Sequence, residues 1–142
     1  MIADAPALDS LPSIQLSLRF QGESFDPDEI TRRMGIEPTT SFMPGDPIAA
    51  DGSGRRRRYG WRLAVEERET LELGTLLSDL QNRVGVSGTT VRQICADLGV
   101  TAVITCSVLQ RGYESSPVLI FPPDFIDWVS GLGASLDVDI WT

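Results

Sequence analysis

The stretch SIQLSLRFQ, residues 13–21, alternates apolar with mostly polar side chains along its whole length. A period of two is typical of a β-strand with one face toward the core and the other toward water. Three further stretches repeat the pattern, and their apolar positions are Tyr59, Trp61, Leu63 and Val65; Ala102, Ile104, Cys106 and Val108; and Ala134, Leu136, Val138 and Ile140. We therefore expect one open sheet whose apolar face is covered by helices.

Helical patterns lie between the four predicted strands. In the segment FDPDEI, residues 25–30, Asp26 can cap a helix, the following proline suits the first helical position, and Glu29 can close a capping box. Phe25 and Ile30 stand at the two positions of a hydrophobic staple. Gly35 suits the left-handed conformation that ends a helix. Apolar spacing predicts three more helices, at Leu73, Leu76, Leu77, Leu80 and Val84; at Val91, Ile94, Cys95 and Leu98; and at Phe125, Trp128, Val129 and Leu132.

The order of these elements predicts the fold class. It reads β-α-β, two helices, then β-α-β, which is the order of a ferredoxin-like sandwich with an insertion. We expect an α+β fold with a single, mainly antiparallel sheet of four to five strands, helices on one face and a two-helix insertion between the halves. Residues 1–12 are predicted to be a loose lead-in to one domain, residues 13–142. Residues 118–121 are the candidate extra strand, after a turn at 112–117.

The basic residues of the chain are unusual in kind. All 12 are arginine, and the 142 residues include no histidine. Histidine is the commonest general base near neutral pH and the commonest metal ligand, so its absence excludes a Ser-His or Cys-His nucleophile pair within one chain. We expect no enzymatic activity and no cofactor. Cys95 and Cys106 fall on apolar faces, and we expect both to be buried free thiols.

The overall charge limits the class of partner. With a formal net charge of -8 and a pI of about 4.4, the chain is poorly suited to nucleic acid but suits docking on a basic protein. Its start lacks the features of a signal peptide, and no apolar run approaches the ~20 residues of a spanning helix. We expect a cytoplasmic protein with a basic protein partner and with neither a nucleic acid nor a membrane partner. The sequence indicates no oligomeric state.

Most candidate site residues lie on the polar face of the predicted sheet. Asp137 and Asp139 point the same way from the last strand, so they could hold Mg²⁺ or Ca²⁺. They could equally pair with Arg19 or Arg62 from other strands, which is the interpretation we favour, and we expect no metal site. Trp141 follows them and is the tryptophan expected to be exposed, as an interface anchor would be.

The irregular stretch at residues 37–58 is longer than most connections in a compact domain, and such loops are usually functional or mobile. Within it, Gly45 and Asp46 could let the backbone approach a ligand, or could form a simple tight turn. Arg55–Arg58 is the only dense basic cluster. It could bind nucleic acid, but no aromatic residue is interleaved, and local charge balancing is the favoured interpretation.

Several of these motifs, in this order, resemble one bacterial family known only as a domain of unknown function. They are Asp26–Thr31 (DPDEIT), Gly35–Thr39 (GIEPT), Gly45–Asp46, Trp61 and Leu136–Trp141 (LDVDIW). The resemblance covers nearly the whole chain beyond its first dozen residues. Pro44 stands where the family usually has lysine, and Trp141 where it usually has tyrosine. The resemblance implies a shared fold and no particular activity.

Two hypotheses of function follow. The first is a non-catalytic protein-binding module, such as a toxin-immunity or regulatory protein, that docks on a basic bacterial partner. It rests on an analogy, since small acidic α+β proteins often resemble the immunity partners of toxins. The second is a small-molecule or metal-binding protein, or a weak hydrolase, that uses Asp46, Arg62, Asp137 and Asp139 around the open sheet.

Overall fold

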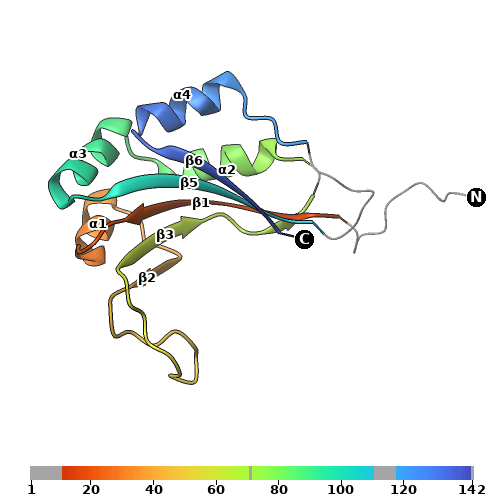
Figure 1. Ribbon diagram of the computed structural model, residues 1–142. Helices are drawn as coiled ribbons and strands as arrows, with labels where there is room; N and C mark the ends of the chain where they lie inside the picture. Colours follow the sequence, from red (N-terminus) through yellow and green to blue (C-terminus); the bar gives the residue numbers. More distant parts are fainter. Residues whose placement is uncertain (1–10, 71, 111–117, 142) are drawn as a thin grey trace, which may run out of the picture.

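The computed structural model describes residues 11–70, 72–110 and 118–141. Within these residues, one open sheet of six strands packs against four helices (Figure 1). The strands are β1 (Ser13–Gln21), β2 (Thr40–Phe42), β3 (Gly60–Ala64), β4 (Arg68–Glu69), β5 (Thr101–Leu109) and β6 (Ser135–Trp141). The helices are α1 (Pro27–Met34), α2 (Gly74–Val84), α3 (Gly88–Leu98) and α4 (Pro123–Gly131). No helix in the described part of the chain is long and apolar enough to cross a membrane.

The sheet is mixed, so the prediction of a mainly antiparallel sheet is wrong. Its strand order is β2-β3-β1-β5-β6, with β4 also paired to β1. Strands β3, β4 and β5 run antiparallel to β1, whereas β6 runs parallel to β5. Parallel neighbours need a crossover, and α4 supplies it by returning the chain to the end of the sheet where β5 began. In a split βαβ arrangement another strand would separate two such strands, but β5 and β6 are directly paired.

The number of strands also differs from the expected four to five. The short strands β2 and β4 were missed, because two or three residues are too few to display a period of two. The extra strand expected at residues 118–121 is not formed; those residues have no regular structure and lead into α4. The turn expected at residues 112–117, and most of the predicted lead-in, lie outside the described residues.

The alternation in the four long strands predicts the core correctly at most positions. Ten residues were expected on the helix-covered face; eight are fully buried, Leu136 is half-buried, and Val138 is 40% exposed. The buried eight are Ile14, Leu16, Leu18, Phe20, Trp61, Leu63, Ile104 and Cys106. Val138 is exposed because β6 is an edge strand, with a paired strand on only one side in the described structure.

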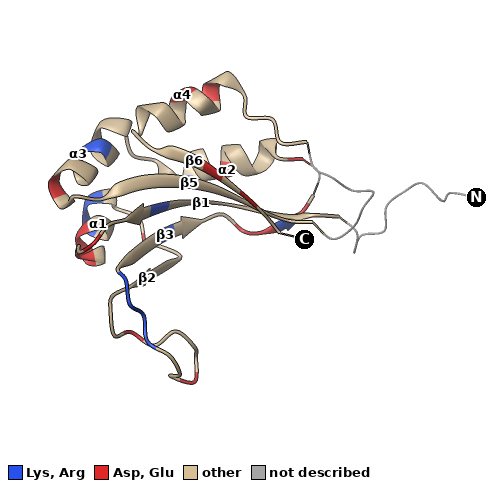
Figure 2. Ribbon diagram, viewed as in Figure 1, with Lys and Arg blue, Asp and Glu red and all other residues tan. Residues whose placement is uncertain are grey.

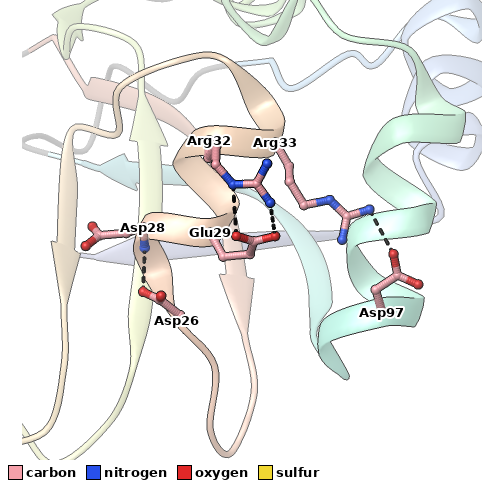
Figure 3. Close-up of polar contacts among 6 residues, drawn as sticks. All are labelled: Asp26, Asp28, Glu29, Arg32, Arg33 and Asp97. Atoms are coloured by element: carbon pink, nitrogen blue, oxygen red, sulfur yellow. Dashed lines mark hydrogen bonds and ion pairs between the residues drawn. The ribbon is translucent and has the colours of Figure 1, made fainter.

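Helix α1 begins and ends where the sequence predicts. The side chain of Asp26 accepts a hydrogen bond from the backbone N of Asp28 at 3.0 Å, and Gly35 ends the helix with φ of 69° (Figure 3). The expected capping box does not close, since the Glu29 carboxylate pairs with Arg32 instead. This local ion pair holds the pKa of Glu29 below its usual value, mainly through the hydrogen bond from Arg32.

The helical layer is joined laterally by polar contacts. Arg33 of α1 forms an ion pair with Asp97 of α3, with 2.9 Å between the guanidinium nitrogen and the carboxylate oxygen (Figure 3). Hydrogen bonds from Gln93 and Arg33 lower the pKa of Asp97.

Both cysteines are free, as predicted. Cys106 is buried, which raises its pKa to about 11, whereas Cys95 is only partly buried.

Candidate functional site

Two arginines face each other on the sheet surface that the helices leave uncovered. Arg19 of β1 and Arg62 of β3 are direct cross-strand partners. Arg19 Nε donates to the hydroxyl of Thr105 at 3.2 Å, and Arg62 donates to the side-chain oxygen of Gln15 at 2.7 Å. Both acceptors are neutral. Burial, and then the charge of Arg19, lower the pKa of Arg62. Neither arginine forms an ion pair with a carboxylate among the described residues.

The long loop predicted at residues 37–58 contains β2 and all but the last residue of a projecting hairpin, residues 43–59, which we call the arm (Figure 1). Its two sides are joined by backbone hydrogen bonds from Gly45 N to Arg56 O and from Arg56 N to Asp46 O, each at 2.8 Å. The Asp46 carboxylate accepts from the backbone N of Met43 at 2.8 Å. Gly45 has φ of 96°, which favours glycine. Gly45 and Asp46 therefore form a tight turn that fixes the backbone of Arg56.

The side chain of Arg56 lies on an aromatic ring. Its guanidinium carbon is 4.1 Å from the ring centroid of Phe42, which is a cation–π contact. The ring in turn lies over Gly60, its cross-strand partner, where any Cβ would overlap it. Arg56 Nε is buried, with no hydrogen-bond partner among the described residues. Phe42 and Gly60 thus place a cation between the arm and the sheet.

Between the arm and the sheet lies a concave space of about 1090 Å³, which we call the arginine cavity. Six arginines line it, namely Arg19, Arg55, Arg56, Arg57, Arg58 and Arg62. Figure 2 shows the basic run of the arm descending from β3, together with the acidic residues Asp46 and Asp51 of the same hairpin. Glu23 is the one acidic residue among the described lining residues. The six arginines were not recognised as one site, because the register that brings β1 beside β3 is not visible in the sequence.

The acidic candidates lie elsewhere on the sheet, on the edge strand β6. Asp137 and Asp139 are paired in register with residues of β5, and both are exposed. Trp141 is 59% exposed, as expected. The predicted pairing of these acids with Arg19 or Arg62 is wrong: no ion pair joins them in the described structure, because β5 separates β6 from β1.

The uncovered face is also less open than the alternation predicts. Ser13, Ser17 and Thr105 are buried on it. They are small, and the long side chains of Arg19 and of Gln15 extend over neighbouring strands. The described residues contain no group of three or more His, Cys, Asp or Glu side chains able to hold a metal ion.

A comparison with protein-family models places these features in a family. Residues 12–142 match the family described as Domain of unknown function (DUF4279). The chain belongs to this family. The match confirms the resemblance found in the sequence, and it spans both the arginine cavity and β6. No curated protein and no solved structure matches the chain.

Proposed function

We propose that this DUF4279 protein is a non-catalytic binding module that docks a basic protein partner along β6. The observation that carries the proposal is the exposure of this edge strand on both of its faces. Ile140 is 58% exposed on one face and Trp141 is 59% exposed on the other, where Asp137 and Asp139 also lie. We call Asp137–Trp141 the β6 surface.

The backbone of β6 supports an extended segment as the occupant. Strand β6 has seven residues and pairs with β5 on one side only in the described structure. An unpaired edge offers its backbone N–H and C=O groups to a further strand, which is a common mode of peptide recognition. Side chains of the added strand would then contact Trp141 and Ile140 alternately on the two faces.

The charge of the β6 surface selects the partner. Asp137 and Asp139 make no ion pair among the described residues, and the whole chain carries a net charge of -8. A second copy of the chain would set acid against acid, and like charges directly opposite each other destabilise a strand pair. A basic segment would meet these carboxylates with complementary charge, which speeds association and excludes wrong partners.

The test begins with affinity capture from the native organism, followed by purification of the captured protein. Its binding is then measured by calorimetry for wild type, Trp141→Ala and Asp137→Arg. We expect each variant to weaken binding about thirtyfold, since truncating a central anchor typically costs 2 kcal/mol or more.

Glu67→Arg provides the matched control. Glu67 is exposed outside the β6 surface, and its replacement changes the net charge by the same amount as Asp137→Arg. The control should bind with wild-type affinity. Equal weakening by Glu67→Arg would show that the effect of Asp137→Arg comes from net charge alone. Wild-type affinity of both Trp141→Ala and Asp137→Arg would exclude β6 as the interface.

A further inference from the structure

We propose that the arginine cavity binds a small molecule through a di- or triphosphate group. The site lies on the β3 side of the sheet and is distinct from the β6 surface. The proposal depends on the pairing of the arginines, on the shape of the cavity and on the chemistry of the guanidinium group.

The six cavity arginines lack acidic partners within the described residues. Outside the cavity, Arg83 and Arg92 also lack a carboxylate partner, but both donate to backbone carbonyl groups. Arg32, Arg33 and Arg68 each form an ion pair with a carboxylate. None of the six cavity arginines does so within the described structure. In a chain with 20 acidic residues against 12 basic ones, six unpaired cations around one space are not explained by a shortage of carboxylates.

The sheet holds two of these cations against electrostatic cost. Arg19 and Arg62 are directly opposite in the β1–β3 register, where like charges destabilise the pair. Proteins depart from such local rules mainly at functional sites. A bound anion between the two guanidinium groups would turn this repulsion into two favourable contacts.

The arm completes the site on the other side. Its Gly45–Asp46 turn fixes the backbone of Arg56, and the Phe42 ring supports the Arg56 side chain. Arg56 Nε is a buried donor left without a partner among the described residues, and buried donors normally have one. Cations are therefore held in place on both walls, so less ordering is required when a ligand binds.

The size and chemistry of the cavity select the ligand. Small-molecule sites typically measure about 300–1,000 Å³, and this cavity of about 1090 Å³ is slightly larger than that range. The planar guanidinium fork binds phosphate through two parallel hydrogen bonds. A single carboxylate would neutralise one of six cations, whereas a di- or triphosphate carries several charges. A long polyanion would meet the remaining surface of a chain with net charge -8.

Isothermal titration calorimetry with tripolyphosphate and with ATP, both without divalent metal, tests the proposal on the full chain. We expect both probes to bind at an ionic strength of about 0.1 M, where the Debye length is ~10 Å. Arg62→Gln and Arg19→Gln should each weaken binding at least tenfold. Tighter binding of ATP than of tripolyphosphate would support recognition of the organic part as well.

Arg32→Gln is the matched control, because it removes the same charge from an exposed residue of α1. It should retain wild-type affinity for both probes. Circular dichroism of each variant, together with thermal stabilisation of the wild type by tripolyphosphate, keeps the test decisive if one variant fails to fold.

Four results would overturn the proposal. They are no binding of either probe, equal weakening by Arg32→Gln, citrate binding as tightly as tripolyphosphate, and arginine-dependent binding of a single-stranded RNA oligonucleotide without binding of the two phosphate probes. The third would assign the cavity to carboxylates, and the fourth would assign it to nucleic acid.

Discussion

Asp26 decides where α1 begins, through one hydrogen bond to the backbone N of Asp28 at 3.0 Å. Asp26→Ala should lower the free energy of unfolding by about 1 kcal/mol, the usual loss for an N-cap. Phe25→Ala should cost more, about 3–5 kcal/mol, because Phe25 is buried in the core as well as adjacent to the cap. Urea denaturation of both variants measures this order.

Asp28→Ala is the control for the cap. Asp28 is exposed and contributes its backbone N, not its carboxylate, to the capping bond. At high salt, which screens its interaction with the helix dipole, its removal should change stability by only a few tenths of a kcal/mol. Equal losses for Asp26→Ala and Asp28→Ala would show that charge, not capping, stabilises the first turn.

Gly60 is required by its cross-strand partner. The Phe42 ring occupies the space that a Cβ at residue 60 would need. Gly60→Ala should therefore destabilise the protein by about 1–3 kcal/mol, as overpacking does. In the double variant Gly60→Ala with Phe42→Ala the overlap is gone. The losses of unfolding free energy in the two single variants should therefore sum to more than the loss in the double variant. Strict additivity in denaturation experiments would contradict this coupling.

At the scale of the elements, α3 and α4 approach each other through two glycines. A Cβ on Gly88 would overlap the backbone carbonyl of Gly131, whereas a Cβ on Gly131 would meet nothing within 4 Å. Gly88→Ala should cost about 1–3 kcal/mol through overpacking. Gly131→Ala should be neutral or stabilising, because alanine is the better helix former. Thermal unfolding of the two variants gives the comparison, and similar melting temperatures would mean that the helices can separate without loss.

The elements also show what a sequence can reveal. The period of two in residues 13–21 is local, and it predicts β1 with its bounds and its buried face. The cap and stop of α1 are equally local. The direction of β6 cannot be read from a local pattern, since it depends on how α4 returns the chain to the sheet. The pairing of Arg19 with Arg62 likewise depends on register between distant strands.

Of the two candidate sites, the sequence pattern indicated the one on β6. Trp141 was predicted to be exposed because it lies on the polar parity of the last strand, and it is. For the arginine cavity the signal was present but incomplete. Both Arg19 and Arg62 hold outward positions, and Arg55–Arg58 directly precede β3. Only the fold of the arm over the sheet brings these groups around one space.

At the scale of the molecule, opposite charges are separated along one sheet. The arginine cavity includes residues of β1 and β3, and the β6 surface lies beyond β5. With neighbouring strands about 4.8 Å apart, β3 and β6 are about 14 Å apart, which exceeds the Debye length of ~8 Å at physiological ionic strength. Arg62 of the cavity should therefore act independently of the β6 surface. Arg19 lies nearer to that surface, since its Nε donates to Thr105, the β5 residue in register with Asp137.

This independence is measurable with the variants already described. Trp141→Ala should leave the affinity for tripolyphosphate within about twofold of wild type at ~0.15 M ionic strength, because it changes no charge near the cavity. Arg62→Gln should likewise leave partner binding unchanged. At low salt a small coupling should emerge and then vanish as salt is added, whereas a coupling above tenfold that persists at high salt would mean that one ligand contacts both surfaces.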